Sequence, residues 1–323
     1  MNHISIIGAG QLGSRHLQAL ASLKQKAVIQ VVDTSLDSLK TAESRFHEVG
    51  KDFAGKVSFH TRIHEIEKEQ DVVIVATNSK IRRVVIEELL SHAIVKNLML
   101  EKFLFTKVGD YAAVGKLIAE KKIKAWVNCP RRMIGFYRDM QKNIAGDVEM
   151  IINGLDWGLG CNGIHYLDLF AFLTRSTKIK LTNDLISENI IESKRPGYIE
   201  FRGTINGSEG NNSFNMTSRF EIAGDFHLAI NTADVKYVIY EGATAKVEMA
   251  KRSTDWKWER TSFEMPFQSQ LTNILLDEIL ETGNCKLTPY EESAELHLHL
   301  LNNFIAFLRR IKNDNSIDEC LIT

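Results

Sequence analysis

Residues 3–16 read His-Ile-Ser-Ile-Ile-Gly-Ala-Gly-Gln-Leu-Gly-Ser-Arg-His. An apolar segment leads into the spacing Gly-x-Gly-x-x-Gly, and the apolar residues after it recur at helical intervals. This order is typical of a βαβ unit that binds a dinucleotide. Gly8 would permit the tight turn, Gly10 would let the backbone approach a pyrophosphate, and Gly13 would let the helix pack on the strand. Gln11 and Leu12 would offer backbone N–H groups to the phosphates at the positive end of the helix dipole.

A second apolar strand, 27–32, ends in Asp33. In dinucleotide-binding folds a carboxylate at this place accepts hydrogen bonds from the adenosine ribose hydroxyls. Taken alone, Asp33 would equally fit a helix N-cap or a solvated turn. A carboxylate repels a 2′-phosphate, and neither Thr34 nor Ser35 is an arginine, so the sequence favours NAD over NADP.

The 323 residues suggest two domains, and 44% hydrophobic residues suffice for sizeable cores. Forty Lys and Arg nearly balance 41 Asp and Glu, which indicates a small ligand and no nucleic-acid partner. The chain enters a strand at once, without room for a signal peptide, and no apolar run approaches the roughly 18 to 20 residues of a membrane span. We therefore expect a soluble, cytoplasmic protein that binds no membrane. The four cysteines form no Cys-x-x-Cys, so we expect reduced thiols and no metal site.

Strands and helices alternate over the first part of the chain. Apolar strands are expected at 57–60, 71–77, 98–101 and 123–127, with helices between them. This alternation predicts an α/β fold, with a doubly wound parallel Rossmann sheet over residues 1–125. The cofactor is expected at the carboxyl ends of its strands. The residues there are Thr77, Asn78, Glu101 and Lys102.

The pattern changes beyond this domain. The segment 147–159 suggests a strand, and 160–174 is so apolar that it predicts a buried helix. Segments of alternating polarity follow at 199–205, 214–220, 226–231, 235–240 and 245–249. They predict an α+β domain, 126–323, with a large, mostly antiparallel open sheet. Its uncovered face is a plausible oligomer interface. Whether the C-terminal helices pack back on the first domain is left open.

Two helices are predicted from short patterns. Ile81, Val84, Val85 and Leu89 share a spacing that predicts the apolar face of a helix. Residues 288–291, Thr-Pro-Tyr-Glu, fit a capping box with proline at the first helical position, and an apolar stripe follows them.

Lys102 is the first candidate catalytic residue. It follows Glu101 at the end of the fifth strand, beside the expected nicotinamide. A lysine there can hold a hydroxyl or carbonyl oxygen of a substrate. The alternative is a surface lysine that happens to follow a strand.

The second candidate group lies on the predicted helix 160–174. Cys161, His165 and Asp168 are spaced i, i+4, i+7 and project from one face. A histidine oriented by a carboxylate can act as a general acid or base when a hydride moves at a carbon that carries a hydroxyl. The alternative is a buried His–Asp pair that only ties the helix down.

The chain resembles the Gfo/Idh/MocA oxidoreductases, the group of glucose-fructose oxidoreductase and inositol dehydrogenases. The matching segments are 8–16, 76–79, Glu101-Lys102 with Leu104-Phe105, 163–169 and 290–294. The resemblance implies a Rossmann domain, a second α/β domain with an open sheet, and dimers or tetramers formed through that sheet. It also implies hydride transfer between a nicotinamide and a sugar or cyclitol carbon. By position, Lys102 would be the lysine of the Glu-Lys-Pro motif and His165 the histidine of the Asp-x-x-x-His motif.

This chain departs from the family pattern at two positions. Phe103 replaces the proline after the lysine, and we expect it to lose the fixed φ and the possible cis bond of that turn. Cys161 replaces the aspartate four residues before His165, which removes a carboxylate. Either the substrate needs fewer polar contacts, Asn162 substitutes, or catalysis is weakened.

Arg131 and Arg132 follow the sixth strand. They could bind a phosphate or carboxylate of the substrate, or form salt bridges where the domains meet. Together with Cys161 and Asn162 they are the candidate substrate residues.

The sequence thus favours an NAD-dependent oxidoreductase that acts on CH–OH groups of a sugar, a sugar acid or a nucleotide sugar. Two other readings stay open. One is a nucleotide-binding sensor of the same fold without turnover, and the other is an epimerase that uses a tightly held NAD. The substrate, the direction of hydride transfer and the choice between dimer and tetramer are not determined by the sequence.

Overall fold

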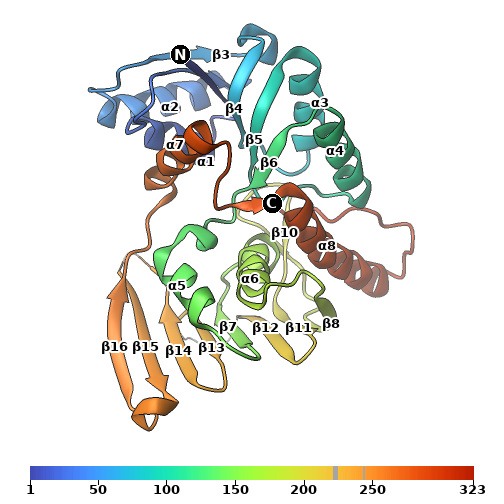
Figure 1. The fold of residues 1–323 in the computed structure, drawn as a ribbon. Coiled ribbons are helices and arrows are strands. Elements are labelled where there is room, and N and C mark those ends of the chain that lie inside the picture. Colours follow the sequence, from blue (N-terminus) through green and yellow to red (C-terminus); the bar gives the residue numbers. More distant parts are fainter. Residues whose placement is uncertain (221–224, 243) are drawn as a thin grey trace. The chain divides into compact units, whose positions relative to one another are not determined.

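The computed structural model describes residues 1–220, 225–242 and 244–323 (Figure 1). The chain forms two compact units. The N-terminal unit comprises Met1–Phe105, Gly109–Asn128 and Pro266–Glu291. The C-terminal unit comprises Thr106–Val108, Cys129–Met265 and Glu292–Thr323. The sequence predicts that the first domain ends at residue 125. The later segment Pro266–Glu291 nevertheless belongs to the first unit.

The N-terminal unit is built on a sheet of seven strands among the described residues, in the order β17-β6-β5-β4-β1-β2-β3. Its strands are β1 (Asn2–Ile7), β2 (Ala27–Val32), β3 (Lys56–His60), β4 (Glu69–Val75), β5 (Ile94–Leu100), β6 (Lys124–Val127) and β17 (Thr288–Pro289). Strands β1 to β6 run parallel, and β17 is antiparallel to β6. The strand order reverses between β1 and β4. In doubly wound sheets, ligands bind at the carboxyl edge beside such a switch point. The predicted Rossmann sheet is confirmed.

Helices connect these strands. They are α1 (Gln11–Leu20), α2 (Leu36–Val49), α3 (Arg82–His92), α4 (Val108–Glu120) and α7 (Thr272–Thr282), with the short turns η1 (Ile63–Glu65) and η4 (Gln268–Gln270). Ser35 caps α2, because its side chain accepts a hydrogen bond from the N–H of Ser38. Asp33 therefore is not the N-cap of this helix.

The predicted helix at this place is confirmed as α3, although not all of the apolar residues that predicted it are buried. Ile81 and Val84 are 47% and 64% exposed, whereas Arg82 is 1% exposed. The Arg82 guanidinium donates to the carbonyl oxygens of Thr77, Phe103 and Leu104. These contacts pair the two terminal nitrogens of the buried guanidinium, Nη1 and Nη2, with backbone acceptors.

The C-terminal unit contains an eight-stranded sheet in the described part of the chain, ordered β16-β15-β14-β13-β7-β12-β11-β8. Its strands are β7 (Glu149–Leu155), β8 (Lys180–Ile186), β11 (Gly203–Glu209), β12 (Asn212–Arg219), β13 (His227–Asn231), β14 (Val235–Tyr240), β15 (Ala245–Lys251) and β16 (Trp258–Phe263). Only β7 and β12 pair in parallel within these residues. The prediction of a large, mostly antiparallel sheet is confirmed.

The remaining elements of this unit are helical or short. They are α5 (Gly135–Asn143), α6 (Leu159–Thr174), α8 (Tyr290–Lys312), the turns η2 (Pro130–Met133) and η3 (Arg252–Thr254), and the two-residue strands β9 (Ile191–Glu192) and β10 (Ile199–Glu200). Helix α6 packs on β12 and is largely buried, as its apolar sequence predicts. The predicted position of Pro289 is wrong, because Pro289 pairs with Trp126 in the sheet and α8 begins only at Tyr290. None of the helices in the described ranges has the length and apolar character to cross a membrane.

Candidate functional site

The three glycines of the turn after β1 have different surroundings. Gly8 and Gly13 lie against other backbone atoms, whereas Gly10 faces open space. Gly8 has φ +98°, and a Cβ on Gly13 would lie 1.8 Å from the carbonyl oxygen of Gly8. A Cβ on Gly10 would meet no atom of the described residues within 4 Å. Gly8 and Gly13 are therefore required by the fold itself. Gly10 leaves a cradle that a pyrophosphate could approach, so the turn fits a dinucleotide.

Helix α1 begins directly at this turn. Its N-cap is Gly10, which makes no side-chain capping bond, and its first turn has no acidic residue. Gln11 and Leu12 thus stand at a positive helix end that no carboxylate of the first turn offsets. Arg45 of α2 adds a positive charge here, donating to Ser14 Oγ at 2.5 Å and to Gln11 Oε1 at 2.9 Å. Sequence reasoning missed Arg45, since nothing local links it to the turn.

Asp33 lies beside the same turn. Its Oδ2 accepts from the N–H of Ala9 at 2.7 Å, and its Oδ1 accepts from the N–H of Ser35 at 2.8 Å. The carboxylate is partly exposed. A carboxylate has about four acceptor positions, so Asp33 can still accept from ribose hydroxyls.

Thr77 and Asn78 follow β4 near the turn, since a Cβ on Gly8 would lie 2.9 Å from Thr77 N. Thr77 Oγ1 is buried and has no hydrogen-bond partner among the described residues. Asn78 Oδ1 accepts from the N–H of Ile81 at 3.3 Å. An unsatisfied buried hydroxyl at a carboxyl strand end agrees with a polar ligand there.

Glu101 is buried in a polar network within the N-terminal unit. It is 3% exposed, and its Oε1 lies 2.8 Å from His16 Nε2 and 2.5 Å from Asn128 Nδ2. His16 Nδ1 lies 2.8 Å from Thr272 Oγ1, so both ring nitrogens are engaged. Burial alone would raise the pKa of Glu101, but the contacts with His16 and Asn128 and the charge of Arg82 hold it below its usual range. Glu101, predicted to bind cofactor, is thus also a support for the loop that carries Lys102.

Lys102 is half-buried at the end of β5. The Lys102–Phe103 peptide bond is cis, so the expectation that Phe103 removes a cis bond is wrong. Arg82 holds the following backbone through the carbonyls of Phe103 and Leu104. Sequence reasoning could not supply this contact, because Arg82 resembles a surface residue of α3.

At the start of α6, in the C-terminal unit, a carboxylate lies beside Cys161. Glu200 of β10 accepts from the backbone N–H groups of Gly160 and Cys161, the latter at 3.1 Å. Asn162 Nδ2 donates to the carbonyl of Trp157 at 2.7 Å. A carboxylate from another segment thus pairs with the free backbone N–H groups at this helix end. Glu200 was not among the predicted site residues.

His165 is half-buried on α6, while Asp168 is fully buried. Asp168 Oδ2 accepts from Arg132 Nε at 2.9 Å, and Arg132 also donates to Glu292 at 2.7 Å. Burial would lower the pKa of Arg132, but the charges of Asp168 and Glu292 raise it. The Asp168 carboxylate is thus committed in part to an arginine, and its pairing with His165 stays a prediction.

Arg131 is also held in ion pairs inside the C-terminal unit. Its Nε donates to Glu241 at 2.9 Å, and its guanidinium lies 4.2 Å from the ring centre of Tyr166. Tyr166 and Tyr137 donate to the same carboxylate at 2.9 and 2.6 Å. The structure therefore places both predicted substrate arginines in salt bridges, the alternative that the sequence left open, and their partners belong to the same unit.

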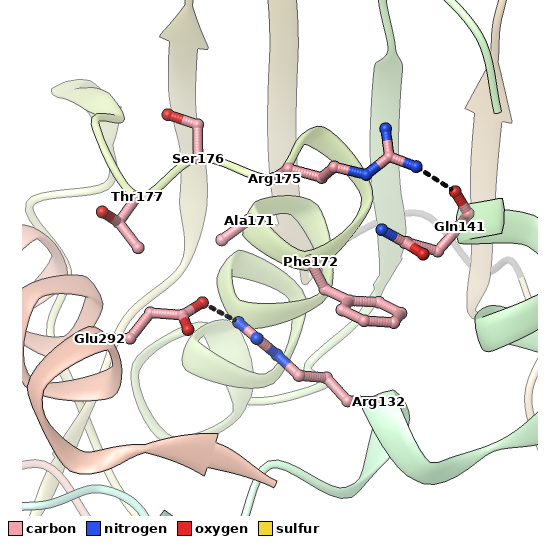
Figure 2. Close-up of a pocket in the computed structure, with 8 residues that line it drawn as sticks. All are labelled: Arg132, Gln141, Ala171, Phe172, Arg175, Ser176, Thr177 and Glu292. Atoms are coloured by element: carbon pink, nitrogen blue, oxygen red, sulfur yellow. Dashed lines mark hydrogen bonds and ion pairs between the residues drawn. The ribbon is translucent and has the colours of Figure 1, made fainter. Parts of the chain in front are cut away.

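A pocket of about 420 Å³ lies next to Arg132 (Figure 2). It is lined by Arg132, Gln141, Ala171, Phe172, Arg175, Ser176, Thr177 and Glu292. Figure 2 shows Arg132 and Glu292 directed toward each other, and Arg175 bonded to the backbone of Gln141. Because Asp168 and Glu292 balance Arg132, the pocket offers little net positive charge. The described residues contain no group of three metal-ligating side chains.

The comparisons agree with this geometry. Residues 2–129 match the sequence model of the Gfo/Idh/MocA family, described as "Oxidoreductase family, NAD-binding Rossmann fold". The match covers β1 to β6, the parallel strands of the N-terminal unit. The resemblance expected from the sequence is thereby confirmed. No curated protein sequence matches the chain.

Solved structures resemble this chain over nearly its whole length. UDP-N-acetylglucosamine 3-dehydrogenase GnnA from Acidithiobacillus ferrooxidans has a TM-score of 0.67 at 15% identity, covering 94% of this chain and 97% of its own. KijD10, a 3-ketoreductase from Actinomadura kijaniata solved with TDP-benzene and NADP, has 0.68 at 14%, covering 94% and 96%. The super-repressor mutant of Gal80p from Saccharomyces cerevisiae has 0.72 at 12%, covering 98% and 99%. At these identities the similarity establishes the fold alone.

Proposed function

We propose that this protein is an NAD-dependent oxidoreductase that moves a hydride to or from a CH–OH carbon of a sugar-type substrate. The observation that carries the proposal is the glycine turn, where Gly10 faces open space and the Asp33 carboxylate lies alongside. The family match over residues 2–129 supports it. GnnA and KijD10, by their names a nucleotide-sugar dehydrogenase and a ketoreductase, support a sugar, sugar acid or nucleotide sugar as substrate.

NAD, when bound, supplies the hydride acceptor or donor. Gly10, Gln11 and Leu12 would hold its pyrophosphate, and Asp33 would accept from the ribose hydroxyls and repel a 2′-phosphate. KijD10 was solved with NADP, so the preference for NAD rests on Asp33.

Lys102 and His165 take the acid–base roles in this proposal. Lys102 would donate a hydrogen bond to the substrate oxygen, and His165 would remove or return the proton of the hydroxyl. Both side chains are half-buried, which keeps them accessible to a ligand while partly excluding water. Cys161, Asn162, Arg131 and Arg132 remain the proposed substrate-side residues.

A second candidate is a nucleotide-binding regulator without turnover. The similarity to Gal80p, solved as a super-repressor mutant, favours it. So does the commitment of Asp168 to Arg132. An epimerase with a tightly held NAD would use the same residues as the dehydrogenase.

We further propose a homodimer or homotetramer formed through the C-terminal sheet. Edge strand β16 is exposed along most of its length, and Trp258 is 51% exposed. Light scattering after gel filtration tests this, and a monomeric mass would contradict it. In an oligomer built on this edge, Trp258→Glu should lower the mass.

The test of function starts with nucleotide-free protein titrated with NADH and NADPH by fluorescence. Tighter binding of NADH is expected. A screen of sugars, sugar acids and nucleotide sugars with NAD follows, and Lys102→Ala and His165→Ala should each lower kcat/KM at least a hundredfold without loss of NADH binding. Lys121→Ala, at an exposed position, is the control. Binding without turnover on any substrate would favour the regulator.

A further inference from the structure

Asn128 follows β6 at the carboxyl edge of the N-terminal sheet. Its backbone N–H donates to the carbonyl of Leu100, the last residue of β5, at 2.8 Å. Asn128 is buried, with only 2% of its surface exposed. The Nδ2 group donates to Glu101 Oε1 at 2.5 Å and to Gln268 Oε1 at 2.9 Å. Both amide protons of Asn128 are therefore used.

These two contacts decide which way the Asn128 amide faces. If the amide were turned over, its oxygen would lie against the Glu101 carboxylate, which has no proton to offer when ionised. His16 supports the ionised state of Glu101, because its Nε2 lies 2.8 Å from the same oxygen, Oε1. Gln268 is fixed in turn, because its Nε2 donates to Thr272 Oγ1 at 3.0 Å. The amide oxygen of Asn128 must therefore point away from the network.

Asn128 Oδ1 is buried and has no hydrogen-bond partner among the described residues. Buried acceptors are nearly always paired in native proteins, so an oriented but unsatisfied oxygen needs an explanation. The position of Asn128 at the carboxyl edge of the sheet supplies this explanation, since ligands of doubly wound sheets bind outside the carboxyl ends of the strands. Thr77 Oγ1, after β4, is a second unsatisfied oxygen at the same edge.

A ligand that pairs with this oxygen must present a hydrogen-bond donor. A nicotinamide carries such a donor in its carboxamide, and a hydrogen bond to it would set the orientation of the ring without adding charge. We propose that Asn128 Oδ1 accepts a hydrogen bond from the carboxamide of the bound nicotinamide, oriented for this by Glu101 and Gln268. The inference rests on the proposed function and makes Asn128 a cofactor-binding residue.

The test compares the affinities of three ligands measured by calorimetry. They are NAD, 3-acetylpyridine adenine dinucleotide, in which a methyl group replaces the amide nitrogen, and ADP-ribose, which lacks the ring. The wild-type protein should bind NAD about tenfold more tightly than the acetyl analogue, the size expected for one buried hydrogen bond. Asn128→Ala should reduce this ratio to about one and leave the affinity for ADP-ribose within about twofold.

Asn97→Ala is the matched control. Asn97 lies in the middle of β5 in the same sheet, and its amide donates to the carbonyl of Asp71 in β4, away from the carboxyl edge. The NAD preference should survive this change. A wild-type protein that binds NAD and the acetyl analogue equally well would overturn the proposal without any variant. So would an Asn128→Ala variant that keeps the tenfold ratio or loses ADP-ribose in parallel. If the wild-type protein binds none of the three ligands, the proposed function is instead refuted.

Discussion

Replacing Gly10 and Gly13 by alanine separates the ligand role of the glycine turn from its folding role. At Gly13 the added Cβ would lie 1.8 Å from the carbonyl oxygen of Gly8, a backbone atom that cannot swing aside. Overpacking of this kind costs about 3 kcal/mol, which corresponds to a fall in Tm of about 6 to 12 °C for a unit of this size. At Gly10 the Cβ meets no atom of the described residues within 4 Å, and φ is −62°. Gly10→Ala should therefore fold normally, with a stability change below about 1 kcal/mol.

The same Gly10→Ala change should weaken NADH binding at least tenfold, because the new methyl group occupies the space that the pyrophosphate would approach. Thermal unfolding followed by circular dichroism measures the stability of both variants, and fluorescence titration measures NADH affinity. The reasoning is refuted if Gly10→Ala binds NADH as tightly as the wild type. It is also refuted if Gly13→Ala unfolds at the wild-type temperature.

Three further predictions follow from the contacts of charged residues. Asp168→Ala removes one of the two carboxylates that Arg132 contacts among the described residues, and it should destabilise the C-terminal unit by about 3 kcal/mol in urea unfolding; an unchanged midpoint would contradict the importance of this pair. The folded-state pKa of Glu101 is lowered, so its stabilisation is present above the ordinary glutamate pKa of about 4.3 and is lost as the pH falls through the folded value. Glu101→Gln should flatten the acid limb of the stability–pH curve measured by thermal unfolding, and an equally steep limb would count against it. Asp33→Ser should raise the affinity for NADPH relative to NADH at least tenfold, and an unchanged ratio in fluorescence titration would remove Asp33 from the ribose site.

The amino-acid sequence by itself determined the two sheets, the glycine turn and the buried helix α6. These features depend on residues close together in the chain. The spacing of Gly8, Gly10 and Gly13 is set by one turn, and strand or helix periodicity reports which face is buried over a few residues. The place of Asp33 beside the turn also followed from the order of strand, turn and strand.

Only the tertiary structure decided which polar groups are buried and with what partners. Arg82 of α3 is buried because its guanidinium donates to carbonyl oxygens 21 and 22 residues further along the chain. His16 and Thr272 meet across 256 positions, and Glu200 reaches the start of α6 from 40 positions away. A buried charge or amide is tolerated only where distant backbone or side-chain groups pair with it, and no local pattern records such partners. The physical basis of each site residue's role therefore lies in these long-range hydrogen bonds, which exist only once the sheet has formed.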